Sequence, residues 1–197
     1  MIAFIPHWLQ QADTDLFLLL NGWNGAGADA VFKWLTYKYS WIPLYIWIIV
    51  LLNQSFRKRA WILIAAAVLL ITSTDQLSTA LKNQTKRLRP CHEPTLAGQV
   101  HTVDKACGGR YGFVSSHAAN TLALSVFLWM LLPRRRKILL PVLLAYVVLN
   151  GYSRIYLGAH YPLDVTGGWL LGFLCAIPLA SVIRQRVIPL SKHEPGA

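Results

Sequence analysis

The chain has 197 residues, of which 55% are hydrophobic and only 14% are charged. Soluble domains carry about a quarter of their residues as Asp, Glu, Lys and Arg, so this composition excludes an ordinary soluble surface and indicates lipid around much of the exterior. The length suits one membrane domain spanning residues 1–197.

The net charge of +11 would suggest nucleic acid if the protein were soluble. The basic residues instead form short clusters between apolar runs, which is typical of loops that flank membrane helices. No basic face interleaved with aromatic residues accompanies the charge. We therefore expect membrane lipids and a lipid phosphate as partners, no nucleic acid and no obligate protein partner.

The first candidate element covers residues 8–20 and mixes acidic and amide side chains with leucines. This pattern predicts an amphipathic helix at the membrane interface, although a sixth, poor spanning segment is the alternative. Residues 1–11 contain no basic leader and no long apolar core, so a cleavable signal peptide is not expected.

Five apolar stretches follow, and a spanning helix needs about 20 such residues. They cover residues 30–52, 60–81, 116–132, 138–152 with its continuation, and 163–183. The third and fourth are short and extend into their polar flanks. The sequence therefore predicts an all-α polytopic membrane bundle with five, or alternatively six, spanning helices.

Three compact basic clusters indicate the orientation of this bundle. They cover residues 57–59, residues 134–137, and Arg184 with Arg186. With five spans all three lie on one side, which the positive-inside rule makes cytoplasmic. The segments 82–115 and 153–162 then face the extracytoplasmic side, in bacterial terms the periplasmic side of the inner membrane.

The cysteines divide between a helix and a loop. Cys175 lies in the last span, where it is expected to be a small buried apolar residue. Cys91 and Cys107 lie in the long outer segment and either form a disulfide or remain free thiols. His92 and His101 in the same segment raise a zinc site, but the spacing matches no familiar ligand pattern, so no metal is expected.

Three polar stretches lie next to predicted spans, and all of them face the same side. The first runs from Lys82 to Pro90, the second is Val114-Ser-Ser-His117, and the third runs from Ser153 to Asp164. This shared location matters more than any one of the stretches, because it brings their side chains to one place.

The basic residues of these stretches suit a phosphate. Lys82 and Arg89 are seven residues apart and Arg154 comes from the third stretch, so the three predict a positive pocket with guanidinium groups for bidentate contacts. Ser115 and Ser116 are good helix caps and present free helix N–H groups to an anion.

The remaining residues suit acid–base and nucleophilic chemistry. His160 and Asp164 are four residues apart at a helix start, where the carboxylate can accept a proton from one ring nitrogen and leave the other free to attack phosphorus. His117 is then the general acid that protonates the leaving oxygen.

The order and spacing of these residues resemble the three-part signature of the type 2 phosphatidic acid phosphatase family. The resemblance covers residues 82–164. It implies that His160 is a nucleophile that forms a phosphohistidine, that Asp164 orients it, and that His117 is the acid and later the base. It also implies that no metal or other cofactor takes part. The implied phosphate-binding residues are Lys82, Arg89, Ser115, Ser116 and Arg154.

One position departs from the family pattern, which usually reads Pro-Ser-Gly-His where this chain has Val114-Ser115-Ser116-His117. A side chain then lies near the phosphate, and we expect a shift in substrate preference without loss of catalysis. From the resemblance and the outward-facing site, we expect undecaprenyl diphosphate to be the substrate of this chain. Lipid A, phosphatidylglycerol phosphate and phosphatidic acid are the alternatives.

Other interpretations remain open. The basic residues from Lys82 to Arg89 also suit lipid headgroups at an interface. A non-catalytic headgroup binder or transporter needs the cations but not His117, His160 and Asp164. Vanadium haloperoxidases share a similar constellation but are soluble. Asp75, seven residues before Lys82, either orients that lysine or only forms a hydrogen bond near the membrane surface.

Overall fold

The computed structural model describes residues 6–37, 39–103, 107–133 and 139–188. These residues form α-helices, short 3-10 helices and a single isolated β-bridge between Leu88 and Tyr111, with no strand among them. The prediction of an all-helical fold is confirmed. The elements are α1 (His7–Gly22), α2 (Ala26–Thr36), α3 (Ile42–Phe56), η1 (Arg57–Arg59), α4 (Ala60–Thr85), η2 (Pro90–His92), η3 (Pro94–Leu96), α5 (Ser116–Leu131), α6 (Leu140–Tyr156) and α7 (Pro162–Arg186).

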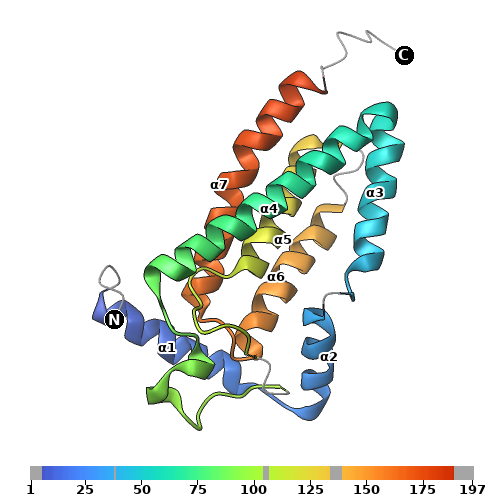
Figure 1. Ribbon diagram of the computed structural model, residues 1–197. Coiled ribbons are helices and arrows are strands. Elements are labelled where there is room, and N and C mark those ends of the chain that lie inside the picture. The colour runs from blue at the N-terminus through green and yellow to red at the C-terminus, as the bar shows by residue number, and fades with distance from the viewer. Residues whose placement is uncertain (1–5, 38, 104–106, 134–138, 189–197) are drawn as a thin grey trace.

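Helix α5 is the centre of the bundle and packs against α4, α6 and most extensively α7 (Figure 1). Two glycines of α7 explain the closeness of that pair. A Cβ atom at Gly168 would lie 2.4 Å from the Ser115 carbonyl oxygen, and one at Gly172 would lie 2.2 Å from that of Ala119. Small residues let helix backbones approach each other, as is common in membrane bundles.

The predicted first span, residues 30–52, is wrong in its boundaries. α2 ends at Thr36 and α3 begins at Ile42, so the stretch is divided between two helices. Pro43 lies in the first turn of α3, where its missing N–H costs nothing, whereas inside one continuous helix it would break a hydrogen bond. The other four predicted helices are present and differ at their ends by a few residues.

Two helical stretches of the described residues are long and apolar enough to cross a membrane, Ile42–Thr85 and Pro162–Arg186, and Ser116–Leu131 is a shorter apolar helix. The first stretch contains α3, η1 and α4, which fold back along each other in Figure 1. The basic η1 and the basic end of α7 lie at the same end of the bundle. The predicted basic cluster 134–137 and the start of the span predicted at 138 lie outside the described residues.

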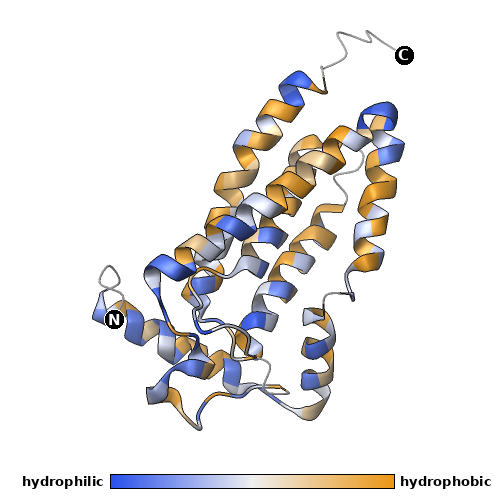
Figure 2. Ribbon diagram, in the orientation of Figure 1, coloured by the Kyte–Doolittle hydropathy of each residue, from blue (hydrophilic) through white to orange (hydrophobic). Residues whose placement is uncertain are grey.

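The opposite end of the bundle is more hydrophilic and carries α1, α2 and the segment that connects α4 to α5 (Figure 2). α1 packs against α6 and α7, and α2 packs against α6. One face of α1 is buried through Asp13, Phe17 and Asn21, while Trp8 and Leu19 are exposed. This amphipathic helix therefore closes one end of the bundle, where the polar stretches meet.

Candidate active site

A cavity of about 560 Å³ opens between the ends of α4, α5 and α6. Six of the eight predicted site residues line it, and they come from three helices and two loops. They are Lys82, Arg89, Ser116, His117, Arg154 and His160. The structure thus brings residues together that are up to 78 positions apart in the sequence.

The three cations reach the cavity in different ways. Lys82 lies in the last turn of α4 and donates to the hydroxyl oxygen of Ser116. Arg89 is held by backbone carbonyls, with its Nε 3.1 Å from the oxygen of Tyr111 and its Nη1 2.9 Å from that of Cys107. Its remaining donors are available to a ligand.

Arg154 is the most buried of the three, with 7% of its surface exposed. Its Nε has no hydrogen-bond partner among the described residues. None of the three cations forms an ion pair with a carboxylate in that part of the chain, and Asp75 is the one acidic residue of the cavity wall. A buried donor without a partner is costly, so this wall is prepared for an anion.

The two predicted serines at the start of α5 have different roles. Ser115 is the N-cap, and its hydroxyl oxygen accepts from the Ala118 N–H at 3.5 Å. It is fully buried and does not line the cavity, because a capping side chain folds back onto its own helix. Ser116 faces the cavity, where its hydroxyl also lies 2.6 Å from that of Ser78. The side chain of His117 is exposed to the cavity.

His160 lies in the turn between α6 and α7, and the carbonyl oxygen of Arg154 accepts its backbone N–H at 3.1 Å. Only 2% of its surface is exposed. Burial, together with the charges of Arg89, Arg154 and Lys82, holds the pKa of His160 well below the usual range of histidine. A neutral imidazole with a free ring nitrogen is a nucleophile.

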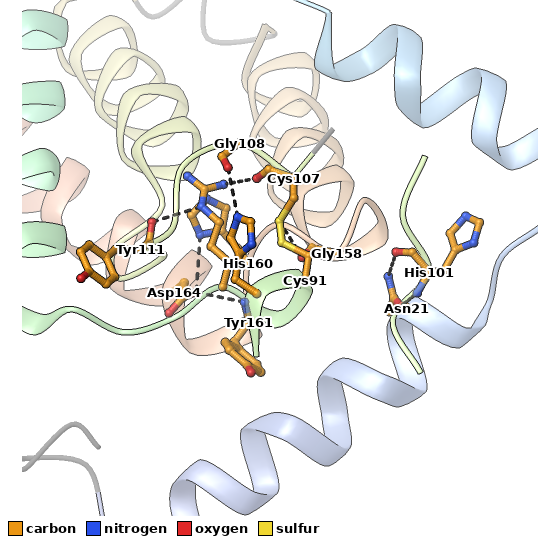
Figure 3. The surroundings of a disulfide bond; sticks show 12 residues. Asn21, Cys91, His101, Cys107, Gly108, Tyr111, Gly158, His160, Tyr161 and Asp164 are labelled. Atoms are coloured by element: carbon orange, nitrogen blue, oxygen red, sulfur yellow. Dashed lines mark hydrogen bonds and ion pairs between the residues drawn. A yellow bond between two sulfur atoms is a disulfide. The ribbon is translucent and has the colours of Figure 1, made fainter. Parts of the chain in front are cut away.

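Asp164 lies next to His160 in the first turn of α7 (Figure 3) and does not line the cavity. Its Oδ2 is 3.5 Å from the Nδ1 of His160, longer than a hydrogen bond. The same oxygen accepts the Tyr161 N–H at 3.1 Å in a capping box. A Cβ atom at Gly112 would lie 2.8 Å from Oδ2, so the glycine leaves room for this carboxylate.

Two charged residues near Asp164 were not predicted as site residues. Arg87 donates to Asp164 Oδ1 at 2.8 Å and to Asp13 Oδ2 at 2.5 Å, and all three side chains are buried. In the sequence Arg87 looks like one of several interfacial bases, and Asp13 like the polar face of an amphipathic helix. One signal in the sequence could have placed Asp13 on the buried face of its helix. Asp13, Phe17 and Asn21 are spaced four residues apart, so they lie on the same helix face.

Cys91 and Cys107 are joined by a disulfide, with their Cα atoms 6.3 Å apart. His92 lies close to both sulfur atoms, but disulfide sulfurs are not thiolate ligands. His101 points elsewhere, with its Nε2 2.8 Å from Asp29. The zinc site considered for these four residues is therefore not assembled. The disulfide instead joins the segment that follows Arg89 to Cys107 (Figure 3). A separate hydrogen bond from the Cys91 N–H to the Gly158 carbonyl oxygen, at 3.2 Å, links the same segment to the turn before His160.

Comparison with known proteins identifies the family. Residues 60–188 match the sequence model of the PAP2 superfamily. The chain is 37% identical over 168 residues to a lipid A 4'-phosphatase of Bacteroides thetaiotaomicron, which covers 84% of this chain and 74% of that protein. It is 30% identical over 187 residues to an undecaprenyl-diphosphatase of Sulfolobus acidocaldarius, which covers 92% of this chain and 82% of that protein.

A solved structure shares the fold. It is a transmembrane PAP2-type phosphatidylglycerolphosphate phosphatase from Bacillus subtilis, with a TM-score of 0.70 over 93% of this chain and 90% of that one, at 23% identity. These proteins are phosphatases of lipid phosphates, and the predicted enzyme class and membrane location are confirmed. The family predicted from the three polar stretches is confirmed as well: this chain belongs to the PAP2 superfamily.

Proposed function

We propose that this protein hydrolyses a lipid phosphate through a phosphohistidine on His160, without a metal ion. The observation that carries the proposal is the cavity wall, where Lys82, Arg89 and Arg154 surround the two histidines without carboxylate partners in the described chain. Binding an anion needs only the cations. The additional presence of a buried neutral imidazole on one side and an exposed imidazole on the other supports phosphoryl transfer.

In the first step the Nε2 of His160 attacks phosphorus, because Nδ1 faces Asp164. The bond from phosphorus to the lipid oxygen breaks as His117 donates a proton to that oxygen. The cations stabilise the charge on the equatorial oxygens of the transferring group. We expect the 3.5 Å contact between His160 and Asp164 to shorten in this complex, as catalytic hydrogen bonds do when substrate binds.

In the second step a water molecule attacks the phosphohistidine and gives its proton to the now neutral His117. The bond from nitrogen to phosphorus breaks, inorganic phosphate leaves, and His160 returns to its starting state. His117 is the acid of the first step and the base of the second. Its removal is expected to cost about 10²–10⁴-fold in rate.

For the substrate we propose a phosphate on a lipid-linked sugar, as in lipid A. Over most of the chain the identity to the lipid A 4'-phosphatase is higher than that to the undecaprenyl-diphosphatase, 37% over 168 residues against 30% over 187, and this supports lipid A over the undecaprenyl diphosphate that the sequence alone favoured. The rest of the cavity wall supports it too, because apart from Asp75 it is uncharged, with aromatic side chains at Trp41, Tyr45 and Tyr146. Such side chains combine an apolar body with a polar group. Undecaprenyl diphosphate is the second candidate, supported by the archaeal relative.

We further propose five membrane spans, α3 to α7, with the cavity on the extracytoplasmic side and α1 at the interface. The basic residues of η1 and the end of α7 lie at the opposite end of the bundle, which the positive-inside rule assigns to the cytoplasm. Large apolar side chains exposed on these helices support lipid contact, for example Val50, Leu69, Val148 and Leu174.

The test is phosphate release by detergent-purified protein in EDTA, with lipid A, undecaprenyl diphosphate, phosphatidylglycerol phosphate and phosphatidic acid as substrates. We expect release that is fastest from lipid A and absent in His160→Ala, which should keep the wild-type melting temperature. Lipid binding without release from any of the four would support the headgroup binder instead. Release that EDTA abolishes would contradict the metal-independent mechanism.

A further inference from the structure

A buried row of alternating charges extends from the site to the N-terminal helix. Asp164 contacts Arg87 at 2.8 Å, and Arg87 contacts Asp13 of α1 at 2.5 Å. The side chain of Arg87 is 8% exposed, that of Asp13 1% and that of Asp164 0%. Desolvating three charges is expensive unless each is paired and well oriented. Because solvent does not screen these buried charges, Arg87 and Asp13 act directly on the carboxylate of Asp164 next to His160.

Asp13 also holds the backbone at the start of α7. Its second oxygen, Oδ1, accepts the N–H of Leu163 at 2.8 Å, one residue before Asp164. The guanidinium of Arg87 lies 4.2 Å above the ring of Tyr161, the residue after His160. One aspartate on α1 thus fixes both the cation that binds Asp164 and the helix turn that carries it. Asp13 lies outside the matched region 60–188.

Asp13 changes the net charge of the row that faces His160. Arg87 bound to Asp164 alone would form a neutral pair, and the carboxylate would be drawn toward the guanidinium and away from the imidazole. With Asp13 sharing the guanidinium, two carboxyl groups face one cation, and the row carries one net negative charge when all three groups are ionised. That charge faces an imidazole that is otherwise surrounded by Lys82, Arg89, Arg154 and His117.

We propose that Asp13 is a positioning residue for phosphoryl transfer, which acts through Arg87 and the Leu163 amide to hold Asp164 against His160. The proposal rests on the function proposed above for His160. It extends the site beyond the three polar stretches to a helix that contributes no group to the cavity.

The test is Asp13→Asn, with Asp15→Asn as the matched control. Asp15 lies on the same helix, is exposed and contacts only its neighbour Gln11 among the bonds described. The amide oxygen that Asp13→Asn introduces can still accept from Leu163, but its NH2 group then faces Arg87, so the change removes both the charge and the hydrogen bond to the guanidinium. We expect kcat to fall about 10- to 100-fold with KM within about two-fold, because a small displacement of a reacting group costs that much. Asp15→Asn should match the wild type.

Asp13→Asn leaves Arg87 with one carboxylate partner and is expected to lower the melting temperature. If it fails to fold, Asp13→Glu, which keeps a carboxylate beside Arg87, is the second variant. This variant restores the charge and should recover part of kcat. Equal kcat in Asp13→Asn and Asp15→Asn, while His160→Ala is inactive, would overturn the positioning role and leave the proposed function standing.

A second readout does not depend on any substrate. The imidazole of His160 can be titrated by NMR in detergent, and Asp13→Asn should lower its pKa relative to Asp15→Asn because a nearby negative charge is removed. If no lipid is hydrolysed, the proposed function fails, and this titration still decides whether Asp13 acts on His160. An unchanged titration would overturn the inference.

Discussion

His160 lies between two groups of charges that differ in how they are satisfied. On the cavity side, Arg89 and Arg154 have donors with no carboxylate partner in the described chain. On the buried side, Arg87 is bound by two carboxylates at 2.5 and 2.8 Å. Both groups are largely removed from solvent, so burial alone does not distinguish them.

The difference separates binding from positioning. A cation without a partner has free donors and gains most when an anion arrives, whereas a fully paired cation gains nothing and instead fixes its neighbours. Substitutions on the cavity side should therefore affect substrate binding and rate while sparing stability. Substitutions on the buried side should affect rate and stability together.

The largest effect is expected on the cavity side for Arg154→Met. Loss of this guanidinium should lower kcat/KM about 10²–10³-fold, the usual cost of removing one group that stabilises transition-state charge. The melting temperature should not fall, because the Nε of Arg154 has no partner to lose and methionine keeps much of the volume. Arg186→Met, an exposed arginine at the opposite end of the bundle, is the control. A strong loss of stability would mean that Arg154 is structural.

A smaller effect is expected on the buried side for Gly112→Ala. The added Cβ would lie 2.8 Å from Asp164 Oδ2 and 3.3 Å from Arg89 Cγ, so the carboxylate, as the nearer group, must move most. We expect kcat to fall about 10-fold, because misplacement of an orienting group slows the reaction. Gly109→Ala adds the same atom three residues earlier, with nothing within 4 Å. Equal kinetics of the two variants would show that the position of Asp164 does not matter.

The smallest effect is a shift in the pH dependence of kcat/KM. The pKa of His160 is held below its usual range, so the imidazole stays neutral at ordinary pH. The acid limb of the profile, where kcat/KM falls as His160 is protonated, should therefore lie below about pH 6.5. Lys82→Met removes a positive charge and should move the limb to higher pH, while Asp13→Asn should move it to lower pH. Titration of the substrate is common to all variants, so their differences report the enzyme. If both variants moved the acid limb in the same direction, the cavity side and the buried side would not act on His160 with opposite charge.

Most of the residues that the sequence singled out for the site line one cavity. Lys82, His117, Arg154 and His160 stand at helix ends, and a membrane protein brings the ends of its spans to one surface, so local spacing was enough to group them. Ser115 was assigned to the phosphate pocket, but the structure uses its hydroxyl as a cap. A cap and a ligand-binding hydroxyl have the same sequence signature.

The buried side was not predictable in this way. Asp13 and Arg87 are 74 residues apart, and Asp13 and Leu163 are 150 apart, so no local pattern connects them. The polar residues of α1 looked like a solvated face, but its packing against α6 and α7 buries two of them, Asp13 and Asn21. The break between α2 and α3 was missed for a related reason, because the apolar run continues through it while Pro43 sets the new start.

The proposed reaction passes phosphate through His160, and trapping the phosphohistidine tests this step most directly. A lipid labelled in its phosphate would be mixed with wild-type protein, quenched under alkaline conditions within one turnover, and the labelled peptide identified. We predict an acid-labile, base-stable phosphate on the peptide that contains His160, and none in His160→Ala. Rapid turnover by the wild type without any labelled peptide, or full activity of His160→Ala, would contradict the account.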